Sequence, residues 1–160
     1  MSLKSASQLG EVSAAPKRKR VLFLCTGNYY RSRYAEELFN HLAKSEGLPW
    51  RAFSRGVAAT QPAANLGPIS RFTLKALQAK AISPEGAEQL PRLCALVDFD
   101  DAQIVIALKE AEHRPIIEQR FPEVADRVRY WHVHDIEFVD PSVALPLIED
   151  RVRELISTLK

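Results

Sequence analysis

The most informative segment of the chain reads Val21-Leu22-Phe23-Leu24-Cys25-Thr26-Gly27-Asn28-Tyr29-Tyr30-Arg31-Ser32. Its first five residues are continuously apolar, which is typical of a strand buried on both faces of a parallel sheet. From Ser32 to about Ser45, apolar residues recur every three or four positions, and this spacing predicts an amphipathic helix. Gly47 supplies a stop signal. The segment is therefore expected to form a strand, a short loop and a helix in direct succession.

Strand and helix patterns continue to alternate along the rest of the chain. The pattern predicts further strands at 50–57, 104–108 and 128–133, and helices at 69–81, 111–119 and 144–159, with a loop at 61–68 and an acidic turn at 98–101. A short helix with loop edges, broken near Pro91, is expected at 83–96. This alternation indicates an α/β fold with three layers: a doubly wound sheet of about four parallel strands with helices on both faces. In such sheets the ligand lies outside the carboxyl ends of the strands, and Cys25 ends the first strand.

Length and composition exclude several broad classes. With 160 residues, the chain is expected to hold one domain, residues 20–160, after a flexible leader, residues 1–19. Lys and Arg number 22 against 20 Asp and Glu, a balance too even to favour a nucleic-acid partner, although the basic run at 17–20 leaves a nucleic-acid or localisation patch open beside a solvated entry to the strand. No apolar run approaches the roughly 20 residues of a membrane span. Two cysteines fit a reducing cytoplasm, and we expect a monomer.

The residues between the predicted strand and helix suit an oxyanion. A helix start offers unpaired N–H groups and the positive end of the helix dipole. Gly27 permits a loop whose amides turn inward, and Arg31 adds a planar charged fork that matches two oxygens of a tetrahedral anion. The same field favours the thiolate of Cys25, and the Ser32 hydroxyl is a donor to its sulfur. Cys25 is therefore a candidate nucleophile for in-line attack on a bound phosphate.

This segment resembles the low-molecular-weight protein tyrosine phosphatases, whose signature is an apolar strand, then Cys, five residues, Arg-Ser and a helix. Gly27-Asn28 and Ala35-Glu36 also fit the signature, and a looser similarity runs through 54–56 to the C-terminal aspartates, so that the resemblance covers most of residues 20–160. It implies a phosphomonoester hydrolase that forms a phosphocysteine, with no cofactor and no metal. It also implies that the loop residues bind phosphate and that Asn28 and Ser54 support the loop. The implied phosphate-binding residues are Thr26, Gly27, Asn28, Tyr29, Tyr30, Arg31 and Ser32.

Two residues depart from the usual family pattern. Tyr30 stands where many members have a second cysteine, so that a protective disulfide beside the nucleophile is not expected. Arg33 stands where many members have proline, and we expect it to alter the rim of the site. Tyr29 and Tyr30 are candidates for an aromatic wall around a substrate ring, with simple packing as the alternative.

The general acid has two candidates. Hydrolysis needs a proton donor for the leaving group, and the family uses an aspartate after the last strand, usually followed by proline. Asp135 ends the strand-like run at 130–134, where strand ends meet the ligand, whereas Asp140 has the proline but lies five residues further along. We favour Asp135 and keep Asp140 as the fallback; the remaining aspartate is expected to cap a helix or turn.

Three other signals are set aside, and two other functions stay open. His132 and His134 lack a third metal ligand, the aspartates at 98–101 lack the pattern of a calcium loop, and Cys94 reads as a packed small residue. The expected substrate is a phosphotyrosine protein or a small aryl phosphate, with phosphate or vanadate as inhibitor. An arsenate reductase of the same fold is the first alternative, with Cys94 as the one available resolving thiol. A phosphate-binding module without activity is the second.

Overall fold

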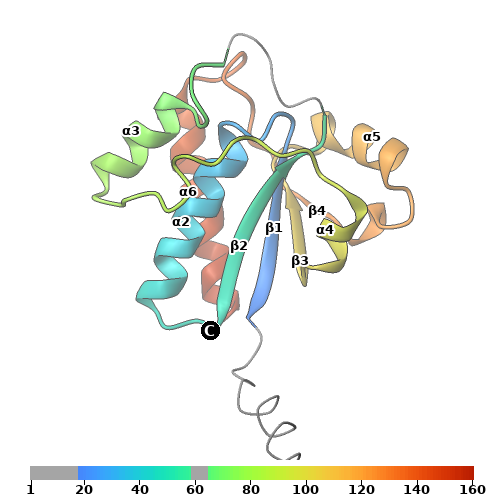
Figure 1. Ribbon diagram of the computed structural model, residues 1–160, viewed down its shortest axis with the longest axis horizontal. Coiled ribbons are helices and arrows are strands. Elements are labelled where there is room, and N and C mark those ends of the chain that lie inside the picture. The colour runs from blue at the N-terminus through green and yellow to red at the C-terminus, as the bar shows by residue number, and fades with distance from the viewer. Residues whose placement is uncertain (1–17, 59–64) are drawn as a thin grey trace, which may run out of the picture.

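The computed structural model describes residues 18–58 and 65–160. Four parallel strands form one sheet in the order β2-β1-β3-β4 (Figure 1). The strands are β1 (Lys19–Cys25), β2 (Trp50–Gly56), β3 (Ile104–Ala107) and β4 (Arg129–Tyr130). β1 lies between β2 and β3, so both its edges and both its faces are covered, which is why its residues from Val21 to Cys25 are apolar and buried.

Helices cover both faces of this sheet. In Figure 1, α2 (Arg31–Ser45), α3 (Arg71–Ala79) and α6 (Pro141–Thr158) lie on one side, and α4 (Leu96–Asp100) and α5 (Glu110–Arg120) lie on the other. A short 3-10 turn, η1 (Ala125–Arg127), precedes β4. The three-layer, doubly wound α/β fold expected from the sequence is confirmed. The chain leaves β1 toward β2 on one side and later reaches β3 on the other, and this switch point lies at the carboxyl end of β1.

The alternation of side chains along β1 divides the core into two clusters. Val21, Phe23 and Cys25 point to the face covered by α2 and α6, where they pack with residues such as Phe39. Leu22 and Leu24 point to the opposite face, toward the cluster that holds Phe99 of α4 and Ile117 of α5. The Cys25 side chain therefore faces the first turn of α2 rather than α5.

The segment from 83 to 101 differs from the prediction. The helix expected at 83–96 does not form: residues 85–88 make a turn, and the backbone of Arg92 and Cys94 pairs with Gly56 at the end of β2 through hydrogen bonds of 2.7 Å. Pro84 and Pro91 explain the failure, because proline interrupts helical hydrogen bonding. The acidic turn expected at 98–101 is also wrong, since Asp98 lies within α4, where its carboxylate accepts from the Ala95 amide at 2.8 Å.

The other differences concern the ends of elements. The predicted strand at 128–133 is reduced to Arg129–Tyr130. β3 ends at Ala107, so residues after Tyr130 have no parallel partner there, and His132 instead forms an isolated antiparallel bridge with Lys109. α6 begins three residues earlier than predicted, at Pro141, where Asp140 accepts a hydrogen bond from the Ser142 amide at 2.8 Å. Residues 1–17 of the predicted leader and residues 61–64 of the predicted loop lie outside the described residues, whereas Lys19, expected at the end of the leader, is the first residue of β1. Among those that are described, none of the helices combines the length and apolar character needed to cross a bilayer.

Candidate active site

A cavity of about 630 Å³ opens at the carboxyl end of β1, above the loop that joins β1 to α2. Cys25 lies at its floor as the last residue of the strand and is 3% exposed. Arg31 is the first residue of α2, and its side chain also reaches the cavity. The sequence-predicted residues that line this cavity are Cys25, Thr26, Gly27, Tyr29, Tyr30, Arg31 and Asp135, whereas Asn28, Ser32, Ser54 and Asp140 do not line it.

The shape of the 25–32 loop depends on a different glycine from the one expected. Asn28, with φ of 53°, takes the left-handed backbone conformation, and Gly27 does not. Gly56 is where a side chain is excluded, because a Cβ there would lie 2.7 Å from the carbonyl oxygen of Thr26. The end of β2 thus packs directly on the loop, and the amides of Val57 and Ala58 bond to the carbonyls of Cys25 and Thr26 at 2.9 and 3.1 Å.

A chain of hydrogen bonds runs behind the loop and ends on the Cys25 sulfur. The Asn28 amide donates to Ser32 Oγ at 3.0 Å and to Ser54 Oγ at 2.9 Å. Ser54 in turn donates to the Glu36 carboxylate, and Ser32 Oγ lies 2.9 Å from Cys25 Sγ. Because Ser32 already accepts from Asn28, its own hydrogen is free for the sulfur, which is the arrangement that stabilises a thiolate.

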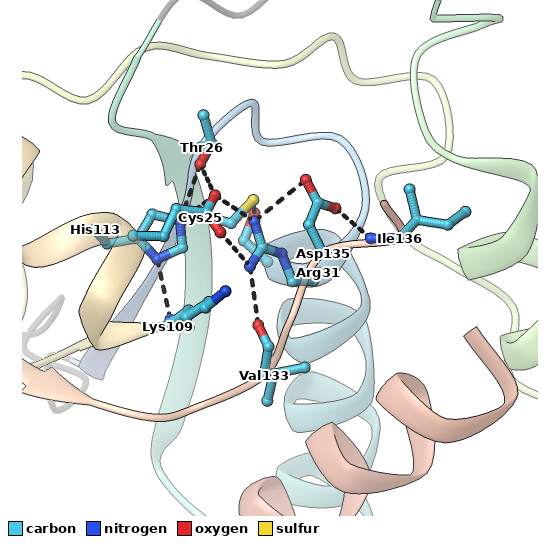
Figure 2. Close-up of polar contacts among 10 residues, drawn as sticks. Cys25, Thr26, Arg31, Lys109, His113, Val133, Asp135 and Ile136 are labelled. Atoms are coloured by element: carbon cyan, nitrogen blue, oxygen red, sulfur yellow. Dashed lines mark hydrogen bonds and ion pairs between the residues drawn. The ribbon is translucent and has the colours of Figure 1, made fainter. Parts of the chain in front are cut away.

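The guanidinium of Arg31 is fixed on two sides. Nη1 donates to the carbonyl of Val133 at 2.9 Å and to Glu112 Oε1 at 3.1 Å, and Nη2 donates to Glu112 Oε2 at 2.8 Å. These hydrogen bonds occupy both Nη1 hydrogens and one Nη2 hydrogen, so that Nε–H and the second Nη2 hydrogen take no part in them, and Nη2 also lies 3.5 Å from Asp135 Oδ2. Figure 2 shows Arg31 beside Cys25, with dashed contacts to Val133 and Asp135. The free edge is the one that matches two oxygens of an anion.

Charges around Arg31 keep this group ionised. Burial alone would lower the pKa of Arg31, but the hydrogen bond to Glu112 and the charges of Cys25 and Asp135 raise it. Burial would likewise raise the pKa of Glu112, but hydrogen bonds from His113, Arg31 and Thr26 outweigh burial and lower it. The two side chains therefore form a permanent ion pair at the working pH of any ordinary enzyme.

Glu112 is a site residue that the sequence reasoning missed. It lies in the first turn of α5, one residue before His113, whose Nε2 is 3.1 Å from Thr26 Oγ1. The Lys109 amide donates to His113 Nδ1 at 3.0 Å, so the ring proton is on Nε2 (Figure 2), and burial lowers the pKa of His113 and keeps the ring neutral. The position of Glu112 in the sequence was a usable signal, because it follows a predicted strand by only a few residues. The carboxyl ends of parallel strands lie at one edge of the sheet, so a carboxylate just after β3 lies near the 25–32 loop.

The two candidate acids occupy different places. Asp135 Oδ2 lies 3.5 Å from Arg31 Nη2 and Asp135 lines the cavity, and its Oδ1 accepts from the Ile136 amide at 2.8 Å. Asp140 lies outside the cavity and caps α6 by accepting a hydrogen bond from the Ser142 amide. That hydrogen bond lowers the pKa of Asp140. Asp135 is not at a strand end as expected, because β4 stops at Tyr130 and Asp135 lies in the following loop.

The two tyrosines of the loop have separate surroundings. Tyr29 is half-buried, and its hydroxyl donates to the Leu66 carbonyl at 2.6 Å, which ties the 65–70 segment to the wall of the cavity. Tyr30 is 6% exposed and packs in the core beside α2, although part of it lines the cavity. Its hydroxyl finds no partner in the described part of the chain, and burial together with Asp135 raises the pKa of Tyr30 to about 12.

Arg33 holds the rim through backbone contacts. Its side chain is buried, and it donates to the carbonyls of Pro68, Gly86 and Gln89 at 3.1, 2.8 and 2.9 Å. A weaker contact of 3.4 Å reaches the Asn28 carbonyl. The arginine in the usual proline position thus connects the 25–32 loop to two surface segments that are distant in sequence.

The signals set aside earlier lie away from the cavity. Cys94 is buried in the core cluster on the opposite face of the sheet, and burial and the nearby Asp98 raise its pKa to about 12. His132 and His134 are exposed and follow the end of β4 rather than lying on a strand. Within residues 18–58 and 65–160, no three His, Cys, Asp or Glu side chains stand close enough together to hold a metal ion.

Comparison with known proteins points in one direction. A family model described as low molecular weight phosphotyrosine protein phosphatase matches residues 20–160. The protein-arginine-phosphatase of Bacillus subtilis (strain 168) is 31% identical over 110 residues, which are 68% of this chain and 67% of that protein. The low molecular weight protein tyrosine phosphatase from T. tengcongensis has 27% identity and a TM-score of 0.74, over 88% of this chain and 99% of that chain. YfkJ from Bacillus subtilis, 24% identical, shares the fold with a TM-score of 0.76 over 91% of this chain and 96% of its own.

Proposed function

The chain belongs to the low molecular weight phosphotyrosine protein phosphatase family and is a cysteine-dependent phosphatase, and we propose that it hydrolyses phosphotyrosine in protein substrates. The observation that best supports the proposal is the environment of the Cys25 sulfur. Cys25 Sγ lies at the cavity floor, 2.9 Å from a serine hydroxyl that is free to donate, and Arg31 lies beside Cys25 in the same cavity (Figure 2). The 25–32 loop acts as the phosphate-binding loop in this proposal.

The reaction proceeds in two displacements. In the first, the Cys25 thiolate attacks phosphorus, the bond from phosphorus to the ester oxygen breaks, and Asp135 gives its proton to that oxygen. In the second, the Asp135 carboxylate takes a proton from water as the water oxygen attacks phosphorus. The S–P bond then breaks, phosphate leaves, and the thiolate is restored. Arg31 and the loop amides hold the equatorial oxygens throughout, and the Ser32 hydroxyl stabilises the sulfur as leaving group.

Aromatic and apolar side chains support an aryl phosphate. Tyr29, Phe72 and Ile136 line the cavity above the loop and offer surfaces on which a phenyl ring can pack. Phosphoarginine is a second candidate, favoured by the similarity to the protein-arginine-phosphatase and by the carboxylates of Asp135 and Glu137 at the cavity, which can accept from guanidinium N–H groups. The ratio of kcat/KM for two peptides of one sequence, one with phosphotyrosine and one with phosphoarginine, decides between them.

The two functions outside hydrolysis have less support. An arsenate reductase needs a resolving thiol, and Cys94 is protonated, buried and on the other face of the sheet. A binding module without activity would not need the nucleophile, the arginine and the aspartate together. We also propose that the protein works as a monomer in a reducing cytoplasm and that phosphate or vanadate inhibits it. We propose no nucleic-acid partner, because the numbers of basic and acidic residues are nearly equal.

The test of the nucleophile is Cys25→Ser. We expect hydrolysis of p-nitrophenyl phosphate to fall by more than about 10³-fold, because the serine hydroxyl is far less ionised than the thiol, while vanadate or phosphate still binds to the loop and Arg31. Cys94→Ser is the matched control and should keep its activity. Full activity in Cys25→Ser would overturn the mechanism.

The test of the acid compares Asp135→Asn with Asp140→Asn. Asp135→Asn should lower kcat for phenyl phosphate by about 10²-fold or more, and should affect p-nitrophenyl phosphate much less, because its leaving group needs little protonation. Asp140→Asn keeps a capping side chain and should change neither rate. A larger leaving-group dependence in Asp140→Asn would assign the acid to that residue instead.

A further inference from the structure

A second cavity of about 630 Å³ lies beside the catalytic one, as a groove between α3 and α6. Its lining is mainly apolar and also includes four charged residues, Lys75, Lys80, Asp140 and Glu149. Its apolar lining comes from Phe72, Ala76 and Ala79 on α3 and from Pro141, Leu145 and Pro146 on α6. Apart from Phe72, which also lines the catalytic cavity, these residues have no part in the reaction proposed at Cys25.

The groove is continuous with the catalytic cavity. Phe72 and Ile136 line both of them, so that the groove starts where the catalytic cavity ends. Ile136 is 41% exposed and immediately follows Asp135. A molecule held by its phosphate at Cys25 therefore has a direct path over these two side chains into the groove between the helices.

The surroundings of the two cavities expose large apolar side chains. Leu66, at the catalytic cavity, is 76% exposed; Phe138, two residues after Ile136, is 68% exposed; and Val143, in the first turn of α6, is 60% exposed. Single exposed apolar residues are ordinary, but Leu66 and Ile136 both line the catalytic cavity and both are exposed, which is typical of a surface that binds another molecule. A free phosphate or a phosphorylated metabolite is too small to contact them all.

The α3 wall is also positively charged. Arg71 lines the catalytic cavity and Lys75, four residues later, lines the groove, so the two cations follow the same path. Neither forms an ion pair with a carboxylate within the described residues, whereas Lys80 at the far end pairs with Glu149 at 2.7 Å. The two cations on α3 therefore favour acidic residues of a substrate on this wall, whereas Glu137 and Asp140 place negative charge elsewhere in the lining of the two cavities.

We propose that the groove between α3 and α6 binds an apolar side chain of the substrate polypeptide near its phosphorylated residue. The inference rests on the proposed function, since it requires a phosphoprotein substrate. The groove makes the enzyme selective among phosphoproteins, because it contacts residues near the phosphorylated one. The phosphate site contacts only the phosphate group and carries out the hydrolysis. Acidic residues of the substrate pair with Arg71 and Lys75.

The experiment uses a panel of phosphotyrosine peptides in which all flanking residues are alanine except one leucine, placed in turn at each of the four positions on either side. In the wild-type enzyme at least one leucine position should raise kcat/KM by about tenfold over the all-alanine peptide, because the leucine is removed from water. Ala79→Trp fills the groove and should abolish that gain. Gln78→Trp, an exposed neighbour on α3 outside the groove, is the matched control and should retain it.

The small ester p-nitrophenyl phosphate does not reach the groove, so Ala79→Trp and Gln78→Trp should hydrolyse it alike. Replacement of Lys75 by Glu should lower kcat/KM about threefold or more for peptides with an acidic flank and leave the all-alanine peptide unchanged. The groove proposal is overturned if no leucine position matters, or if the gain survives in Ala79→Trp. Failure of the proposed function has a different signature: the wild type hydrolyses the small ester but no phosphotyrosine peptide, and the same leucine panel built on phosphoarginine then decides the role of the groove.

Discussion

The contact between Glu112 and Arg31 determines which edge of the guanidinium is available to a substrate. Val133 and Glu112 together take three of the five guanidinium hydrogens, and the two that remain lie on one edge. Without Glu112 the side chain is still charged, but it can rotate and offer another edge. Glu112 is therefore a positioning residue, acting on the reaction through Arg31 rather than by touching phosphate itself.

Glu112→Gln tests this role. Kcat should fall about tenfold, because a misoriented guanidinium stabilises the transition state less well, while KM should stay the same or decrease, because a negative charge near the anion site is removed. Glu110→Gln is the control, since Glu110 lies in the same turn of α5 and pairs with the exposed Arg114 at 2.8 Å. A rise in KM with unchanged kcat would contradict the positioning role and indicate a binding effect.

At the scale of elements, the end of β2 supports the 25–32 loop. Gly56 pairs through its backbone with Arg92 and Cys94 on one side and packs against Thr26 on the other. Three segments that are far apart in sequence thus meet at one residue without a side chain. Arg33 adds a second connection of this kind by donating to the carbonyls of Pro68, Gly86 and Gln89.

Gly56→Ala should therefore be much more harmful than Gly27→Ala. The added methyl group would lie 2.7 Å from the Thr26 carbonyl oxygen, so β2 or the loop must move, and we expect a loss of about 2 kcal/mol or more in the free energy of unfolding. At Gly27 a Cβ meets open space and the backbone is not left-handed, so Gly27→Ala should change stability by less than about 1 kcal/mol. Urea denaturation of both variants measures the difference, and equal losses would contradict the steric argument.

The elements near the nucleophile were predictable because local patterns specify them. The apolar run of β1 and the three- and four-residue spacing of α2 predicted the strand, the helix and the position of Cys25 between them. The partners of these residues were not predictable in the same way. Glu112 meets Arg31 across 81 residues of sequence, and Gly56 is needed because of a backbone that its own neighbours do not specify. The predicted helix at 83–96 failed because proline interrupts it and the 92–94 backbone pairs with Gly56, a partner that lies far away in sequence.

For the whole molecule, two carboxylates on opposite sides of the loop affect stability in opposite directions. Glu112 pairs with Arg31, and its pKa is lowered although burial acts against this. Glu36 stands behind the loop, where burial raises its pKa despite the hydrogen bond from Ser54. An acid whose pKa is lowered by folding stabilises the protein above the unfolded-state pKa of about 4.3 and loses that contribution as the pH falls; an acid whose pKa is raised does the reverse.

Glu112→Gln and Glu36→Gln should therefore differ at neutral pH. Glu112→Gln should lose about 2 kcal/mol of unfolding free energy at pH 7, because Arg31 keeps its charge but loses its partner. The loss should shrink as the pH falls below about 4.3 toward 3, because the unfolded wild-type chain then takes up a proton at Glu112 while the folded protein keeps this carboxylate ionised. Glu36→Gln should be neutral or stabilising by up to about 1 kcal/mol at pH 7, because the amide oxygen can still accept from Ser54 and no charge is buried. Urea titrations of both variants and the wild type at pH 7 and pH 3 give the comparison. A different result would be that Glu36→Gln loses as much unfolding free energy as Glu112→Gln at pH 7. In that case the folded protein needs Glu36 as an anion, and the hydrogen-bonded chain that connects Glu36 to Cys25 contains a charged acceptor rather than a neutral one.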